Sequence, residues 1–347
     1  METRTIQEQL DSNRRSVSFD SYDLAARQLI EMLIENMIDI APEYQRHFKW
    51  NAERQSQLIE SLLLGIPVPS LFMATNKDST WEVVDGLQRL TTLINFACPE
   101  DQISNINANS KKLRLTGLQK LTSINGMTFE DLPKSVQIMF LTRPIKVTVL
   151  NDRSDFGVRY DLFERLNTGG ITLHPQEIRN CVFVGEFNDF LKECAQNLSF
   201  RSVLKIPGDA ERSGNLEELA LKFFAYYERS DLFVHSVKEF LNEYMKDKTS
   251  VFKDKKKLRE VFEKTFHELA NSLPNGIVRG NRKNTTPLVL YEAISVGVAK
   301  AIVEGKVINT TNLQLLLDDD KLKRLTTGAT NSRKMLLDRI NYVKDGC

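Results

Sequence analysis

Residues 81–94 of this chain read Trp81-Glu-Val-Val-Asp85-Gly86-Leu87-Gln88-Arg89-Leu90-Thr91-Thr92-Leu93-Ile94. This stretch opens with a mostly apolar run typical of a short buried strand, and the residues after Asp-Gly have helical spacing. The sequence therefore predicts a strand that passes through Gly86 directly into a helix. A glycine lets the backbone approach a ligand closely, and the free N–H groups of a helix N-terminus favour an anion. Arg89, in the first turn, adds a fixed positive group.

Further strands and helices are predicted around this junction. Leu71–Ala74 and Ile145–Leu150 are apolar runs, and the first fits a hairpin with residues 81–84. An amphipathic helix is expected from Ser21 as its N-cap, and a second helix from the cap Asn51 to the stop Gly65.

The next segment, residues 99–130, is rich in Asn, Ser, Lys and Thr, and predicts a small ribbon or surface excursion. Helical spacing returns over Asp155–Leu166 and resumes after His174-Pro175, where Glu177 completes a capping box. From residue 181 onward the pattern is helical. We therefore predict a polar arm at 1–20, an α+β domain at 21–180 and an all-α domain at 181–347.

The composition is that of a globular protein, with 41% hydrophobic and 27% charged residues. The net charge of +1 hides an asymmetry: residues 1–200 hold 21 Lys and Arg against 26 Asp and Glu, and residues 201–347 hold 26 against 20. Four widely spaced cysteines predict neither a disulfide framework nor a zinc site. Without an apolar leader or an apolar run of membrane-spanning length, the sequence predicts a cytoplasmic protein with reduced thiols and no membrane contact.

The central motif carries residue types suited to phosphate chemistry. A helical wheel places Leu87 on the packed face of the predicted helix and Gln88, Arg89 and Thr92 on the opposite side. Arginine can bind phosphate through two N–H groups, glutamine can orient a water or a base edge, and Asp85 can hold Mg²⁺ or position an attacking water. A structural alternative stays open, in which Asp85 caps the helix and Arg89 pairs with a nearby acid.

Two more clusters could complete a pocket. Tyr44-Gln45-Arg46-His47-Phe48-Lys49-Trp50 combines cations with aromatic rings, which can bind phosphate and stack a base; alternatively, it is a loop anchored in a core by Phe48 and Trp50. Phe163-Glu164-Arg165-Leu166-Asn167-Thr168-Gly169-Gly170 ends a helix in a glycine-rich turn whose N–H groups could face an anion. A simple helix stop explains the second cluster equally well.

Basic residues of the second half suggest contact with DNA, although solvated surface is the usual role of such runs. The candidates are Lys255, Lys256, Lys257, Arg279, Arg282 and Lys283. The four histidines have no metal-ligand spacing and no nucleophile motif, so the sequence supports neither a metalloprotease nor a hydrolase triad.

Four ordered motifs together resemble one family. They are Tyr44-Gln45-Arg46 with Trp50; Leu58-Ile-Glu60-Ser61 with Gly65-Ile66-Pro67-Val-Pro69; Val84-Asp85-Gly86-Leu87-Gln88-Arg89; and Phe163–Gly170 with Glu177-Ile178-Arg179-Asn180. This order resembles the N-terminal domain of GmrSD-type, modification-dependent (type IV) restriction endonucleases. The signature of that family is Asp-Gly-Gln-Gln-Arg, and here Leu87 stands in place of the first Gln.

The resemblance implies a ParB/sulfiredoxin-like fold that binds and hydrolyses a nucleoside triphosphate with Mg²⁺, in prokaryotic defence against phage or foreign DNA. In that interpretation Asp85, Gln88 and Arg89 are catalytic, and Asp85 holds Mg²⁺. The nucleotide-binding residues are then Arg46, Trp50, Gly86, Arg89, Thr92, Asn167, Thr168 and Gly169.

The same resemblance bears on partners and alternatives. Residues 200–347 contain only His235 and His267, which predicts a stand-alone member without the family's His-Asn-His nuclease. A separate nuclease subunit, DNA and a second copy of the chain are further partners left open. The alternative functions are a non-catalytic module that recognises foreign or modified DNA and, ranked last, a nuclease built on Asp85 and Glu60.

Overall fold

The chain was analysed as a computed structural model, which describes residues 6, 8, 18–40, 50–76, 78–106, 111–151, 156–166, 174–206, 214–280, 284–328 and 330–347. It divides into two compact units, residues 1–172 and 173–347. The predicted boundary at residue 180 lies inside helix α9 (Pro175–Val182), which belongs to the second unit.

The first unit is built on a five-stranded mixed sheet in the order β1-β5-β3-β4-β2. Strands β1 and β5 are antiparallel, as are β3 and β4, whereas β3 runs parallel to β5 and β2 parallel to β4. The strands are β1 (Phe19–Ala25), β2 (Ile38–Asp39), β3 (Leu71–Thr75), β4 (Trp81–Asp85) and β5 (Pro144–Leu150). The predicted strands at 71–74, 81–84 and 145–150 are confirmed.

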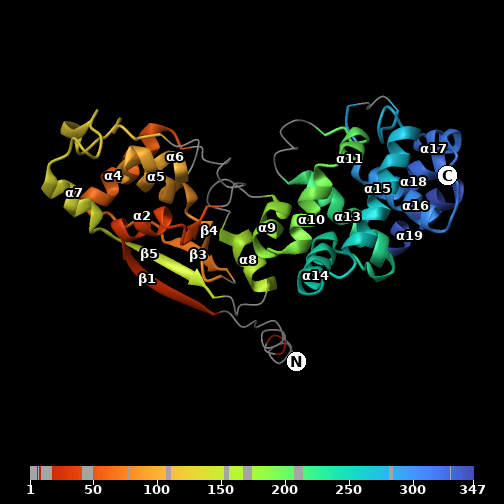
Figure 1. Cartoon of the computed structure of the whole chain (residues 1–347), viewed down its shortest axis with the longest axis horizontal. Coiled ribbons are helices and arrows are strands. Elements are labelled where there is room, and N and C mark those ends of the chain that lie inside the picture. Colours follow the sequence, from red (N-terminus) through yellow and green to blue (C-terminus); the bar gives the residue numbers. More distant parts are fainter. Residues whose placement is uncertain are drawn as a thin grey trace. The chain divides into compact units, whose positions relative to one another are not determined.

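Helices gather on one face of this sheet (Figure 1). They are α2 (Ala26–Ile34), α4 (Ala52–Leu64), α5 (Leu87–Ala97), α6 (Glu100–Ile106) and α7 (Lys134–Leu141), with the 3₁₀ turn η1 (Thr122–Ile124). The core between α2, α4, α5 and the sheet includes Leu29, Ile59, Met73, Ile94 and Val147. Helix α8 (Phe156–Leu166) packs against β4.

Local capping signals of α4 are confirmed. The Asn51 side chain accepts a hydrogen bond from the backbone N–H of Arg54, and Gly65 ends the helix with φ +74°. The N-cap predicted at Ser21 is wrong, because Ser21 lies inside β1 and pairs with Thr148 of β5. Helix α2 instead begins at Ala26.

Part of the segment 99–130, which was predicted as a small ribbon or surface excursion, belongs to the core. Leu113, Leu115, Leu118 and Phe129 of this segment are buried and belong to the core of the first unit. The backbone of Leu113 donates to the carbonyl of Asn95 on α5 at 2.7 Å. The polar residues of the segment therefore alternate with apolar ones that close the core over α4 and α5.

The second unit is helical, so the predicted fold class, an α+β region followed by an all-α region, is confirmed. Its helices are α9, α10 (Glu186–Ala195), α11 (Leu198–Ser202), α13 (Asn215–Arg229), α14 (Val237–Ser250), α15 (Lys255–Ser272), α16 (Leu288–Val303), α17 (Thr310–Leu317), α18 (Asp320–Leu325) and α19 (Arg333–Gly346), with the 3₁₀ turn η3 (Ser230–Leu232). Helix α16 is buried over most of its surface, as expected for a central helix that is apolar on all sides. Among the described residues, no helix is both long and apolar enough to cross a membrane.

Candidate functional site

The junction between β4 and α5 has the geometry that the opening stretch predicts. Strand β4 ends at Asp85, Gly86 is the N-cap with φ +106°, and α5 begins at Leu87. The ladder between β3 and β4 shifts register before Asp85, so that Val84 is an extra residue in β4. Such bulges redirect the side chain that follows them, and they are common beside functional sites.

Gly86 is required by its neighbours as well as by its backbone angle. A Cβ atom at this position would lie 2.3 Å from Cδ2 of Leu71. Residues other than glycine rarely adopt a positive φ. The glycine therefore serves the packing of β3 against the junction, in addition to any approach of a ligand.

Arg89 holds the junction together. Its Nη2 donates to Oδ2 of Asp85 at 2.6 Å, and its Nη1 donates to the backbone carbonyl of Pro69 at 2.6 Å. Only 13% of the Arg89 side chain is exposed, against 36% for Asp85. The structural alternative, in which Arg89 pairs with a nearby acid and Asp85 caps the helix, is therefore half correct. Arg89 does form an ion pair, with Asp85 as the acid, but no side chain caps α5.

Gln88 connects the junction to another predicted motif. Its Oε1 accepts a hydrogen bond from the backbone N–H of Trp50 at 3.1 Å. The guanidinium of Arg54 lies over the indole ring of Trp50, 4.9 Å from its centre. Trp50 and Gln88, 38 residues apart in sequence, are therefore neighbours at the start of α5.

The helical wheel predicts that Thr92 faces the site, but the structure places it in the core. It is fully buried, and its hydroxyl donates to the carbonyl of Gln88 at 2.7 Å. Helix α5 packs on both α2 and α4, so more than one side of the helix is covered. Leu87 packs against the core, in agreement with its predicted position.

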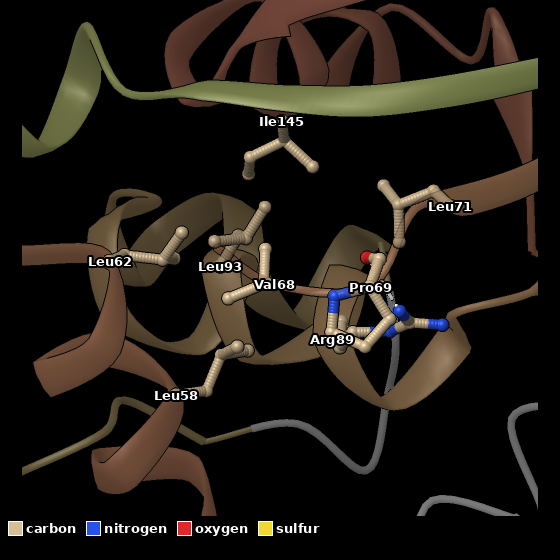
Figure 2. A pocket seen from close by; sticks show the side chains of 8 residues that line it. All are labelled: Leu58, Leu62, Val68, Pro69, Leu71, Arg89, Leu93 and Ile145. Atoms are coloured by element: carbon tan, nitrogen blue, oxygen red, sulfur yellow. Dashed lines mark hydrogen bonds between the residues drawn. The ribbon is translucent and has the colours of Figure 1, made fainter. Parts of the chain in front are cut away.

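Arg89 also lines a small apolar pocket (Figure 2). In Figure 2 the guanidinium of Arg89 lies beside Pro69 at one end, and aliphatic side chains form the rest of the wall. The lining residues are Leu58, Leu62, Val68, Pro69, Leu71, Arg89, Leu93 and Ile145. The space suffices for about one water molecule, so the pocket cannot hold a nucleotide.

Comparison with known protein families finds a match for most of the first unit and the start of the second. Residues 28–184 match the family model of the GmrSD restriction endonuclease N-terminal domain. This segment is a GmrSD N-terminal domain. The match runs from α2 through α9, and it relates the chain to restriction, the defence of a cell against phage and other foreign DNA. No curated protein and no solved structure matches the chain.

Glu60 of the GmrSD N-terminal domain is committed to the fold. Its Oε1 accepts hydrogen bonds from the backbone N–H groups of Lys120 and Leu121, both at 2.8 Å. Burial raises the pKa of Glu60, but these hydrogen bonds outweigh it and hold the pKa below its usual value. Among the described residues, no three His, Cys, Asp or Glu side chains gather as a metal site. The nuclease alternative built on Asp85 and Glu60 stays a prediction.

The remaining predicted nucleotide ligands, Arg46, Asn167, Thr168 and Gly169, lie outside the described residues, as does the rest of the 41–49 segment. Helix α8, which carries the first part of the fourth motif, ends at Leu166. Phe163 of that motif is fully buried.

The predicted DNA-binding residues are not alike. Lys255 lies 3.4 Å from Glu186, whereas Lys256 and Lys257 are exposed on α15. Arg279 is half-buried and donates to the carbonyl of Leu317 at 2.6 Å and to the hydroxyl of Thr326 at 2.8 Å. Arg282 and Lys283 lie outside the described residues. The predicted contact with DNA stays a prediction for all six residues.

The link from Trp50 to Gln55 and Asn95 was not predicted from the sequence. Both are buried, and the Gln55 amide donates to the carbonyl of Trp50 at 3.0 Å. The signal for them was an amide side chain at an inward-facing position of an amphipathic helix, where an apolar residue is usual.

Proposed function

We propose that the GmrSD N-terminal domain of this chain binds the phosphate groups of a nucleoside triphosphate at the junction of β4 and α5. One observation supports this most strongly: parts of three motifs, distant in sequence, meet there. Trp50 bonds to Gln88, and Arg89 bonds to both Asp85 and Pro69. The protein then acts as a nucleotide-dependent sensor or regulator in defence against phage or foreign DNA.

The electrostatics of the junction favour an anion. Helix α5 has 11 residues, and its N-terminus presents backbone N–H groups and the positive end of the helix dipole. Arg89 lies in the first turn and adds its charge, while two of its five N–H groups hold Asp85 and Pro69. These features support binding of phosphate near Gly86 and Gln88.

Asp85 suits the Mg²⁺ ion that accompanies a nucleoside triphosphate. Proteins hold such an ion through one or two carboxylates, while the phosphates supply further ligands. Asp85 is partly exposed at the end of β4, and only its Oδ2 is engaged by Arg89. A bound Mg²⁺ would neutralise phosphate charge, and we propose hydrolysis of the terminal phosphate as the reaction at this site, with Asp85, Gln88 and Arg89 as its residues.

The first test is a thermal-shift screen of the full chain against ATP, GTP, CTP and UTP with Mg²⁺, with phosphate release measured in parallel. A ligand at 100 times its Kd adds about 2.7 kcal/mol to the stability of the folded state. The variant Asp85→Asn keeps an acceptor for Arg89 but loses the charge. We expect it to bind at least about tenfold more weakly, as when a charged contact is lost, and to release no phosphate.

The matched control is Glu31→Gln, which removes a carboxylate charge from the exposed Arg27–Glu31 pair in the same unit. This control should bind and hydrolyse like the wild type. If none of the four nucleotides shifts the unfolding of the wild type, with or without duplex DNA, the proposed function is wrong. If a nucleotide binds but no phosphate is released, the proposed hydrolysis is wrong and the proposed binding stands.

A further inference from the structure

Strand β1 is an unshielded edge of the sheet in the first unit. It pairs with β5 on one side, and in Figure 1 it lies at the outer edge of the sheet. The opposite edge, β2, has two residues, whereas β1 has seven. Proteins usually shield a long edge strand with lysine, proline, a bulge or a covering segment, because its backbone groups can pair with another strand. Strand β1 contains neither lysine nor proline, and its register with β5 is continuous.

Two hydrogen bonds at the ends of the ladder show which residues of β1 face outward. The N–H of Ala26 donates to the carbonyl of Arg143 at 2.9 Å, and the N–H of Asn151 donates to the carbonyl of Ser18 at 3.0 Å. Hydrogen-bonded and non-bonded pairs alternate in an antiparallel ladder, so the even-numbered residues of β1 are those that bond to β5. The backbone N–H and C=O groups of the odd-numbered residues therefore point away from the sheet.

Three of these outward residues have no backbone partner among the described residues, namely Phe19, Ser21 and Asp23. The fourth, Ala25, is engaged, because its N–H donates to Oε1 of Gln28 at 3.0 Å. The edge also presents a large apolar side chain, since Phe19 is 59% exposed. Unpaired backbone groups beside an exposed aromatic ring are the features by which a sheet edge accepts a further strand.

We infer that β1 is the interface between two copies of this chain, which pair antiparallel, edge to edge, about a twofold axis at Ser21. This register sets Ser21 opposite Ser21 of the second copy, and Phe19 opposite Asp23. All three outward residues of each copy are then paired, and each pair exchanges two backbone hydrogen bonds. The sheet continues from one copy into the other. This inference goes beyond the proposed nucleotide site and does not depend on it.

The charges of β1 select this register. The strand carries Asp20 and Asp23 and no basic residue. An axis at Asp20 or at Asp23 would set two carboxylates directly opposite each other, which destabilises a strand pair. With the axis at Ser21, Asp20 lies opposite Tyr22 and Asp23 lies opposite Phe19. The strand is therefore complementary to a second copy of itself without any contact between like charges.

An axis at Tyr22 is the remaining symmetric register, and it uses the edge less well. It would pair Phe19 with Ala25, whose N–H is already held by Gln28. The axis at Ser21 thus pairs every available outward group. Twofold pairing also closes the assembly at two copies, because the other edge of each sheet is the short strand β2.

Disulfide trapping tests the register. In a Cys347→Ser background, the remaining native cysteines, Cys98, Cys181 and Cys194, are buried. Ser21→Cys would set two thiols in a hydrogen-bonded pair whose Cα atoms lie about 5.5 Å apart, within the range of a disulfide. Asp23→Cys is the matched control, because the two copies of this position would be at least about 13 Å apart.

We expect mild oxidation to give a cross-linked dimer of Ser21→Cys and little or none of Asp23→Cys, as seen on a non-reducing gel. Equal yields from the two variants, or a higher yield from Asp23→Cys, would contradict the pairing.

Sedimentation equilibrium of the full chain measures the association itself. Ser21→Pro removes an outward N–H and leaves the ladder with β5 intact, and proline is tolerated on edge strands. Ser21→Ala is the control, because it keeps the backbone groups. We expect the wild type and Ser21→Ala to form dimers with similar Kd. The Kd of Ser21→Pro should rise at least about tenfold, because both hydrogen bonds at the axis are lost.

A wild type that stays monomeric up to about 100 μM would overturn the inference. So would a dimer whose Kd is the same for Ser21→Pro and Ser21→Ala. If Ser21→Pro does not fold, the comparison of Ser21→Cys with Asp23→Cys still decides the result. A monomeric chain that instead binds a lysine-rich strand peptide through β1 would show that this edge recruits a basic partner, and the twofold pairing would be wrong.

Discussion

At the scale of single residues, Gly86 is the most constrained position of the site. Its φ of +106° disfavours any side chain, and a Cβ atom would overlap Leu71. These are separate effects, because the first is local and the second depends on β3. The chain offers a matched comparison in Gly126, which has φ +83° and no atom within 4 Å of its would-be Cβ.

We predict that Gly86→Ala destabilises the protein more than Gly126→Ala. Each variant should lose about 1–2 kcal/mol from the unfavourable φ. Overlap with Leu71 should add about 1–3 kcal/mol at Gly86 alone. Urea unfolding of both variants, followed by circular dichroism, measures the difference, and equal losses would show that Leu71 moves aside freely.

At the scale of elements, α9 is attached to the second unit through a buried charge cluster. Arg179 on α9 lies 3.1 Å from Glu218 on α13, and Lys222 lies 3.2 Å from the same carboxylate. Burial raises the pKa of Glu218, but Lys222 and Arg179 outweigh it and hold the pKa below its usual value. Helix α9 is therefore the last helix of the family match, and the acid that binds its Arg179 lies on α13, outside the match.

The Glu218 cluster predicts a pH dependence. The pKa of Glu218 is lower in the folded than in the unfolded state, so its negative charge stabilises the folded protein. This stabilisation is complete above the usual carboxyl pKa of about 4.3, and it is lost as the pH falls through the pKa of the folded state. At pH 7 the free energy of unfolding of Glu218→Gln should be about 3 kcal/mol lower than that of the wild type. On acidification this variant should lose less stability than the wild type, because it has no carboxylate to protonate at this position.

The control for this prediction is Glu304→Gln, which removes an exposed partner of Lys344 and should change stability by less than about 1 kcal/mol. Guanidinium unfolding between pH 7 and pH 3 compares the three proteins. Parallel pH curves for the wild type and Glu218→Gln would contradict the assigned role of Glu218.

At the scale of the whole molecule, the two units each have a core of their own. The first is formed by the sheet with α2, α4 and α5, and the second surrounds α16. Units with separate cores commonly unfold in separate steps. The proposed nucleotide site lies entirely within the first unit.

We predict two transitions in differential scanning calorimetry. A nucleoside triphosphate with Mg²⁺ should raise the transition of the first unit, because a ligand stabilises only the unit that binds it. Glu218→Gln should lower the other transition. A single transition that moves as a whole under both changes would show that the units unfold together.

Short-range patterns made much of the fold predictable. The cap at Asn51, the stop at Gly65 and the strand before Asp85 each depend on residues within a few positions, and all were predicted correctly. Ser21 was not, because Leu24, Leu29 and Leu33 have helical spacing, whereas β1 is stabilised by pairing with β5 more than 100 residues later. The burial of Leu113, Leu115, Leu118 and Phe129 was missed because it also depends on packing against distant elements.

Periodicity, capping and motif order along the chain were enough to predict the strand–glycine–helix junction, the α+β and all-α order, and the family resemblance. The partners of the site residues could not be predicted in this way, because they are set by tertiary packing. Arg89 bonds to Pro69, Thr92 is buried, and Gln88 is held through Trp50 to Gln55 and Asn95. Such contacts join residues far apart in sequence, and they depend on how α4, α5 and β3 pack rather than on any local pattern.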